Sequence, residues 1–381
     1  MPQQIPSVGQ HQLKRAAIAM ERLRSWLEFS GYSAVTLTTP AAVSWLTGGI
    51  HRQVDSASCT SEVWAVVSGK GAYLIASEVE LDRIRAEYQP ARLGFDELLG
   101  FPWYKPDGAA TVAGSIGGTE ASDGHPDLGA NVNADLIELR LALSEPELDD
   151  LKTLGVDVSN AMTCALEAFE PGVSDFEIQS TLSKQLEGCG ARTPILIVGG
   201  DDRISRYRHP LAQGLPIWHT AMAVVVAERA GLHVAMTRYT SIEPLPIELV
   251  ATFSKLRNIN EEILSACRPG NAYGAVLERM DHAYREAGYP NEWRHHYQGG
   301  PIGFLQREFE IAPANHESRW YQQRLVIGTA VAFNPSLPGG AKLEDTYILT
   351  ESGLDPVTTS KTLGYATGSE FDEFGVLRFR P

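Results

Sequence analysis

The stretch AMAVVVAERAGLHVAMTRYT, residues 221–240, is an apolar run, a turn at Ala230-Gly231 and a second run with β-branched and aromatic residues. This pattern predicts a β-hairpin. A second stretch of the same kind, TAVAFNPSLPGGAKLEDTYILT, begins at Thr329, and the turn between its two apolar runs contains Pro and Gly. The chain is therefore expected to contain two similar hairpins.

Each hairpin stretch follows a segment that reads helix, Pro-Gly break, helix. The first segment is ALEAFEPGVSDFEIQSTLSKQLEGCG, and the second is ILSACRPGNAYGAVLERMDHAYREAGYP. Pro171 and Pro269 hold matching places in the two segments. Because self-similarity of this kind is typical of a repeated structural unit, the sequence predicts an internal duplication.

The residues before the duplication predict a smaller α/β domain. Apolar residues recur at helical spacing over 11–30, and AVTLTTPAAVSWLTGG (34–49) predicts a strand and a short helix. VWAVVSGKGAYLIAS (63–77) predicts a hairpin, and ATVAGSIG (110–117) predicts a further strand. Ser144 and Glu147 have the spacing of a capping box at a helix start. We therefore expect an N-terminal domain over residues 1–140 and a second domain over 141–381.

The composition excludes several kinds of partner. The 381 residues include 32 basic and 47 acidic side chains, which gives a net charge of −15. Binding to phosphate groups needs a basic face, so neither nucleic acid nor an anionic membrane is expected as a partner. No apolar run approaches the ~18 residues of a spanning helix, and the N-terminus lacks the apolar core of a signal peptide. A cytoplasmic protein is expected, with reduced thiols at Cys59, Cys164, Cys189 and Cys267.

Two helix–Pro-Gly–helix–hairpin units in one domain resemble the pita-bread fold of the creatinase, aminopeptidase P and methionine aminopeptidase family. The resemblance covers roughly Leu139 to Gly353, and Trp45-Leu46-Thr47-Gly48 is similar to a turn of the creatinase-type N-terminal domain. It implies an α+β chain with a duplicated pita-bread C-terminal domain and a smaller α/β creatinase-type N-terminal domain. It also implies a homodimer, in which His51 and Arg52 would help to form the pocket of the other subunit.

The resemblance also locates a metal site from which most ligands are absent. Metallopeptidases of this family hold two divalent ions with two Asp, one His and two Glu side chains. The corresponding residues in this chain are, in the same order, Val224, Ala235, Gly300, Asn334 and Glu344. Divalent ions such as Mn²⁺ and Zn²⁺ need several carboxylate or imidazole ligands, so we expect no metal and no other cofactor.

Creatinase is the relative in this family that works without metal, and the resemblance to it implies two catalytic residues. His209 lies close to the place of the catalytic His of creatinase, with a shift of one residue, and creatinase also has a Glu at the place of Glu344. An imidazole suits proton transfer near neutral pH, and a carboxylate can hold an amidine, guanidine or ammonium group. The alternatives are a surface-loop histidine and an exposed strand carboxylate that pairs with Lys342.

Further candidates for substrate contact lie close to these positions in the sequence. Guanidinium groups bind carboxylates in bidentate fashion, amides can replace metal–oxygen contacts by hydrogen bonds, and Thr237 stands where creatinase has a second substrate-binding Glu. The candidates are Arg208, Arg238, His233, Thr237, Gln298, Arg307 and Asn334. For each of them a place in the core or on a solvated face is the alternative.

Two other motifs predict no site. His295 and His296 have no third ligand at metal spacing, so they do not predict a zinc site. Gly299-Gly300-Pro301-Ile302-Gly303 lacks the Lys-Ser/Thr ending of a phosphate loop. In the C-terminal tail, the apolar residues with docking potential are Phe371, Phe374, Leu377 and Phe379.

These observations predict a metal-independent hydrolase that acts on a C–N bond of a small zwitterionic metabolite, either amino-acid-like or amidine-like. His209 would move the proton, Glu344 would hold the cationic end, and arginines would hold the carboxylate. Two alternatives stay open: a catalytically inactive pseudo-peptidase that binds or scaffolds partners, and a lyase on the same fold. A cavity that contains His209 and Glu344 would favour an enzyme, whereas a filled pocket would favour a binding protein.

Overall fold

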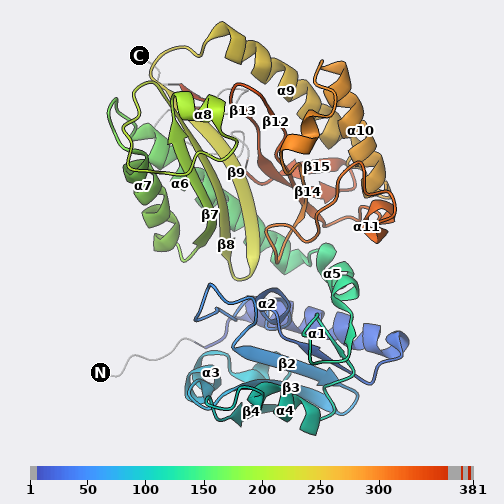
Figure 1. The fold of residues 1–381 in the computed structure, drawn as a ribbon. Helices are drawn as coiled ribbons and strands as arrows, with labels where there is room; N and C mark the ends of the chain where they lie inside the picture. Colours follow the sequence, from blue (N-terminus) through green and yellow to red (C-terminus); the bar gives the residue numbers. More distant parts are fainter. Residues whose placement is uncertain (1–6, 359–369, 372–375, 379–381) are drawn as a thin grey trace. The chain divides into compact units, whose positions relative to one another are not determined.

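The computed structural model describes residues 7–358, 370–371 and 376–378, which form two compact units. The first unit contains the described residues up to Glu147 and also Ala230–Leu232; the second contains Leu148–Arg229 and the described residues from His233 onward. Helices and strands are mixed in both units, which confirms the predicted α+β class (Figure 1). The sequence had placed the boundary between the domains at 140–141.

The first unit contains a six-stranded sheet in the order β4-β3-β2-β1-β5-β6. The pairs β1–β2 and β2–β3 are antiparallel, and β4, β5 and β6 join in parallel. The strands are β1 (Ala34–Leu37), β2 (Val63–Ser68), β3 (Gly71–Ser77), β4 (Glu97–Phe101), β5 (Ala121–Ser122) and β6 (Ala130–Asn131). The helices are α1 (Gln10–Ser30), α2 (Pro40–Leu46), α3 (Leu81–Glu87), the 3₁₀ helix η1 (Pro90–Leu93), α4 (Gly108–Ser115) and α5 (Asn133–Leu141).

The strand predicted over residues 110–117 is wrong, because most of this segment lies in helix α4. Its residues are mainly Ala, Gly and Ser, and alanine has the highest helix propensity of the common residues. Ala113 is fully buried and packs in a cluster with Trp64 and Val66 of β2. The small side chains of the segment fit a helix packed closely on the sheet, and that contact is not visible in the local pattern.

The second unit consists of two similar halves, as the predicted duplication requires (Figure 1). The elements of the first half are α6 (Glu145–Glu167), α7 (Asp175–Gly188), β7 (Arg192–Gly200), α8 (Asp202–Arg206), β8 (Thr220–Arg229) and β9 (Leu232–Ser241). The second half begins with α9 (Ile247–Ala266), α10 (Tyr273–Glu286), the 3₁₀ helix η2 (Glu292–His295), β10 (Gly299–Ile302) and α11 (Arg319–Gln322). It continues with β11 (Ala330–Phe333), β12 (Ser336–Leu337), β13 (Ala341–Lys342), β14 (Asp345–Thr350) and β15 (Gly353–Pro356).

Both predicted hairpins form. Strands β8 and β9 are neighbours in a five-stranded sheet of order β16-β17-β9-β8-β7, which includes β16 (Glu370–Phe371) and β17 (Val376–Arg378). The turn residues Ala230 and Gly231 have φ values of 52° and 81°. In the second hairpin β11 pairs antiparallel with β14, and the short pair β12–β13 extends the connection between them. Most residues of β8 and β9 are buried, which accounts for their nearly continuous apolar sequence.

The two hairpins meet edge to edge where β9 runs beside Glu344–Thr346. The backbone N–H of Thr237 donates to the carbonyl oxygen of Glu344 at 3.1 Å. The hydroxyl of Thr346 accepts from the N–H of Ala235 at 2.9 Å and donates to the carbonyl oxygen of Ala235 at 3.0 Å. These bonds fix the register between the two halves of the second unit.

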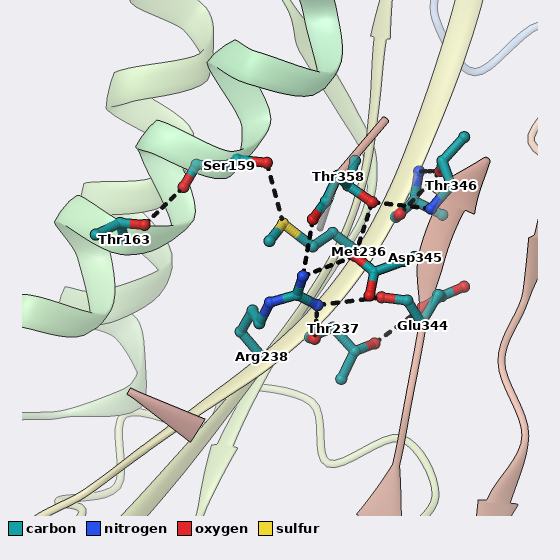
Figure 2. A network of polar contacts seen from close by, with 10 residues as sticks. Ser159, Thr163, Met236, Thr237, Arg238, Glu344, Asp345, Thr346 and Thr358 are labelled. Carbon is teal, nitrogen blue, oxygen red and sulfur yellow. Dashed lines mark hydrogen bonds and ion pairs between the residues drawn. The ribbon is translucent and has the colours of Figure 1, made fainter. Parts of the chain in front are cut away.

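Arg238 holds this junction together (Figure 2). Its buried guanidinium donates to the carboxylate of Asp345 at 2.7 Å and to the carbonyl oxygen of Thr358 at 2.8 Å. A third bond, of 2.7 Å, goes to the carbonyl oxygen of Thr237. The hydroxyl of Thr358 also donates to Asp345, at 2.8 Å. Arg238 therefore has a structural role at the seam between the two halves.

Three other expectations concern the chain as a whole. No helix in the described part of the chain is long and apolar enough to cross a membrane. All four cysteines are free thiols. Phe374 and Phe379 of the C-terminal tail lie outside the described residues.

Replacing Arg238 with methionine should lower the free energy of unfolding by about 3–5 kcal/mol, because removal of one partner leaves the other buried charge uncompensated. Urea unfolding followed by circular dichroism measures this loss. Arg206→Met is the matched control, because it removes an exposed ion pair with Asp202 and should cost less than about 1 kcal/mol. Equal losses in the two variants would contradict the role given to Arg238.

Candidate functional site

A cavity of ≈ 630 Å³ lies in the second unit and is lined by residues of both halves. Part of its lining is apolar and comes mainly from β7 and β8: Pro194, Ile195, Leu196, Ile197, Leu211, Val224, Val226 and Ala235. The rest is polar and comes mainly from the second half: His209, Tyr297, Gln306, Arg307, Glu310, Asn334, Lys342 and Glu344. A cavity of this volume with a few polar groups is typical of a small-molecule site.

The positions that correspond to family metal ligands come together at this cavity. Val224, Ala235, Asn334 and Glu344 line it. Gly300 lies beside it, because Arg307, another lining residue, donates from Nη1 to the carbonyl oxygen of Gly300 at 3.2 Å. The duplicated fold thus brings five residues from distant parts of the sequence to one place.

The residues at these positions do not fit a two-metal centre. The side chains of Val224 and Ala235 offer no lone pairs, Gly300 has no side chain, and Asn334 offers a neutral amide. Throughout the part of the chain that the structure describes, no group of three or more His, Cys, Asp or Glu side chains could hold a metal ion. One carboxylate and one amide do not replace the ligands that such ions need. The side chains at these positions therefore differ from the ligands with which the metallopeptidases of the family hold two ions.

Glu344 is a buried carboxyl group at the seam between the hairpins. Its side chain is 5% exposed and accepts a hydrogen bond of 2.9 Å from the hydroxyl of Thr237. Burial raises the pKa of Glu344, and the ammonium group of Lys342 and the bond from Thr237 oppose this shift. Because Lys342 and Glu344 are two residues apart in an extended segment, both side chains reach the same cavity.

Lys342 is a cation of the site that the sequence had suggested only as an ion-pair partner for Glu344. It is 4% exposed, and its ammonium group donates to the carbonyl oxygen of Arg208 at 2.9 Å. Burial lowers the pKa of Lys342 to about 8; Glu344 opposes the shift, and Arg208 adds to it. The spacing Lys342-x-Glu344 in a predicted strand is the signal that could have identified it as a cavity residue.

His209 lies next to a second histidine, His296. Their Nε2 atoms are 3.2 Å apart, and the ring centroids are 5.0 Å apart. A hydrogen bond between these atoms requires one ring to donate and the other to accept, so at least one ring is neutral. Burial and the charges of Lys342 and Arg208 lower the pKa of His209. Burial, Lys342 and His209 lower the pKa of His296 to about 3, so the ring of His296 is neutral at pH 7.

Arg307 and Asn334 are the two predicted substrate-binding residues that line the cavity. The guanidinium of Arg307 is held by the carbonyl oxygen of Ala332 at 2.8 Å and by the carboxylate of Glu310 at 3.3 Å. The side-chain oxygen of Asn334 is buried and accepts no hydrogen bond from the protein. A buried acceptor without a donor is costly, so this oxygen suits a bound donor group.

The other predicted substrate-binding residues lie outside the cavity lining. Their polar groups bond to other parts of the protein. Arg238 binds Asp345, as described above. Arg208 forms an ion pair with Glu292 and donates to the hydroxyl of Ser336 at 2.8 Å. These two arginines therefore do not provide the carboxylate-binding groups that the sequence suggested.

His233, Thr237 and Gln298 also differ from the expectation. The ring of His233 lies 3.0 Å from the carbonyl oxygen of Gly303, and the hydroxyl of Thr237 is bonded to Glu344. Gln298 is buried, and both ends of its amide are used: the oxygen accepts from Tyr284 at 2.8 Å, and the nitrogen donates to the backbone of His296 at 2.9 Å. These three residues lie outside the cavity lining, and Thr237 contacts the site through its bond to Glu344.

His51 belongs to the first unit, where its side chain is buried. It is 5% exposed, its Nδ1 lies 3.0 Å from the hydroxyl of Tyr88, and its Nε2 lies 3.1 Å from the hydroxyl of Ser61. The expected role of His51 at the pocket of a second subunit stays a prediction.

Comparisons with known structures agree with the predicted fold. The chain is similar to dipeptidase PepE from Mycobacterium ulcerans, with a TM-score of 0.75 and 19% identity over 92% of this chain and 97% of that chain. It is also similar to an Xaa-Pro dipeptidase from Bacillus anthracis, with a TM-score of 0.71 and 19% identity over 91% of this chain and 98% of that chain. The N-terminal domain of the FACT complex subunit SPT16 from Cicer arietinum gives a TM-score of 0.66 and 14% identity over 93% and 97% of the two chains.

Comparison of the sequence with family models gives one assignment. No curated protein sequence matches the chain. The model of metallopeptidase family M24 matches residues 152–351, which is more than half of the chain and includes both hairpins. The predicted pita-bread fold and its family are thereby confirmed. The chain belongs to metallopeptidase family M24.

Proposed function

We propose that this protein hydrolyses a C–N bond in a small, carboxylate-bearing substrate without a divalent metal ion. The observation that carries the proposal is the cavity where the family ligand positions converge, which now contains His209, Lys342 and Glu344. The family assignment and the structural neighbours named as dipeptidases support a C–N bond as the target. The substrate would be amino-acid-like or amidine-like.

His209 is the group that would move protons. Its pKa is lowered from the ordinary value of 6.5, which favours the neutral imidazole. The neutral ring would take a proton from water as the water oxygen attacks the carbonyl or amidine carbon. It then gives this proton to the leaving nitrogen as the C–N bond breaks. Hydroxide is thereby added to carbon and a proton to nitrogen. General acid–base catalysis of this kind contributes roughly 10²–10⁴-fold to the rate.

Lys342 and Arg307 would supply the positive charge that the metal ions supply in a two-metal site. The ammonium of Lys342 is buried and is held by a carbonyl group, which does not neutralise its charge. In a buried site a fixed cation stabilises a carboxylate or a developing oxyanion far more than it would in water. Asn334 and Glu344 would accept hydrogen bonds from the nitrogen end of the substrate.

A binding protein without activity is the competing proposal, and the similarity to a FACT complex subunit is the observation that favours it. The loss of four ligands would also fit the decay of an enzyme. Against it stands the cavity of ≈ 630 Å³, which is not filled by side chains and is lined by both His209 and Glu344. Elimination in place of hydrolysis stays an alternative, and a cytoplasmic homodimer stays a prediction.

Turnover should not depend on divalent metal. A panel of dipeptides, N-acylamino acids and guanidino acids would be incubated with the purified chain, and products would be followed by mass spectrometry. Treatment with a chelator should leave the rate of any productive substrate unchanged, because the donor set cannot hold a two-metal centre. Loss of turnover with the chelator and its recovery on addition of Mn²⁺ would contradict the proposal.

His209→Ala should lower kcat by roughly 10²–10⁴-fold, because it removes the group that moves the proton in the proposed reaction. The matched control is His282→Ala, which removes a surface histidine paired with Glu286 and should leave kcat unchanged. Both variants would be assayed on the same substrate, with folding checked by circular dichroism. Retention of wild-type kcat by His209→Ala would rule out the proton-transfer role.

The pH dependence of kcat/KM should be bell-shaped. The acid limb reflects His209, whose pKa lies below its ordinary value of 6.5; activity falls as pH drops through that pKa and the imidazole becomes charged. The alkaline limb reflects Lys342, whose pKa is about 8; anion binding weakens as pH rises and the ammonium loses its proton. Lys342→Arg should keep its charge and shift the alkaline limb upward. An unchanged alkaline limb in that variant would show that Lys342 is not the titrating group.

A further inference from the structure

The apolar part of the cavity lining is one continuous surface. In the register of β7 and β8, Ile195 lies opposite Val226, and Ile197 lies opposite Val224. Residues two apart in a strand share a face, and directly opposite pairs are in contact, so these four side chains form a single aliphatic patch. We call this patch the aliphatic wall. Ala235 of β9 lines the same cavity.

The aliphatic wall replaces groups that would make this part of the site polar. Val224 and Ala235 stand at two positions where the family has aspartate. Val224, Val226 and Ala235 are 5%, 5% and 2% exposed, so the cavity is their remaining contact with solvent. A polar or charged ligand group placed on this surface would lose its hydration without gaining hydrogen bonds, which is unfavourable. An apolar group placed there would gain free energy from burial.

The charged groups of the same cavity set a second requirement for the ligand. Lys342 and Arg307 line it together with the aliphatic wall and with the carboxylates of Glu310 and Glu344. Arg307 is paired with Glu310, whereas the buried ammonium of Lys342 donates to a carbonyl oxygen, so Lys342 is the cation that is placed to bind an anionic group. A ligand that satisfies both parts has an anionic group at one end and an apolar substituent at the other. The volume of ≈ 630 Å³ has room for both.

We propose that the aliphatic wall is a specificity pocket, and that the ligand is a small carboxylate whose aliphatic or aromatic substituent lies on Ile195, Ile197, Val224 and Val226. The carboxylate is bound by Lys342, with Arg307 beside it. This inference deepens the proposed function, because it names the substrate class of the same site. It concerns binding alone, so it can be tested without turnover.

The test is isothermal titration calorimetry of the full chain with straight-chain carboxylates from acetate to hexanoate, and with 3-phenylpropionate. Affinity should rise about fourfold for each added methylene, as expected for burial of a CH₂ group. Hexanamide, which has no charge for Lys342 to bind, should bind about 10- to 100-fold more weakly than hexanoate. An affinity that does not depend on chain length would overturn the proposal.

Two variants locate the effect on the aliphatic wall. Val224→Thr/Val226→Thr keeps the shape of the wall but adds hydroxyl groups, and should remove most of the gain per methylene. Ala235→Leu adds bulk beside the aliphatic wall, and should weaken hexanoate binding more than acetate binding. The matched control is Val225→Thr, which lies outside the cavity lining and should keep the wild-type dependence on chain length. Wild-type dependence in the first two variants would overturn the proposal.

The outcomes separate this inference from the proposed function. If the protein hydrolyses nothing, or needs a metal ion, but the carboxylate series rises as expected, the binding inference stands and the proposed function fails. If turnover without metal is found but the series is flat, the proposed function stands and the specificity pocket is wrong.

Discussion

The structure of the second unit depends on the contact between its two halves at β9 and Glu344–Thr346. Each half alone is a helix pair with a hairpin, and each hairpin presents one edge to the other. The bonds from Thr237 and Ala235 align these edges, and the buried ion pair between Arg238 and Asp345 holds them. The residues that line the cavity come from both halves. The alignment of the two halves therefore determines which side chains share the cavity.

The same scaffold can place positive charge in a cavity in two ways. A metal ion is held by several anionic ligands, so the ion and its ligands must be present together. A lysine side chain carries its charge on the chain itself; the ammonium of Lys342 is held by the carbonyl of Arg208, although burial lowers its pKa. If Lys342 supplies the positive charge, as proposed, no acidic metal ligands are required at the positions of Val224 and Ala235.

The sequence predicted the hairpins, the duplication and the family because these depend on local patterns and on Pro and Gly at fixed places. It could not predict which polar residues face the cavity. Arg238 and Gln298 are close in sequence to ligand positions, yet the side chain of each is bonded within the protein by contacts with residues distant in sequence. His296 and Lys342 were missed as partners in the site because their importance comes from contacts with segments distant in sequence, the loops at Arg208 and His209. Helix α4, which the sequence predicted as a strand over 110–117, was missed for a similar reason, because its packing on β2 is a contact between distant segments.

The bond from the ammonium of Lys342 to the carbonyl of Arg208 ties two functions to one side chain. The acceptor is the residue immediately before His209, so this lysine anchors the loop that carries the imidazole. A substitution that removes the hydrogen-bond donor at position 342 would also remove this bond to the loop. The proposed affinity for an anion and the placement of the histidine therefore depend on the same side chain.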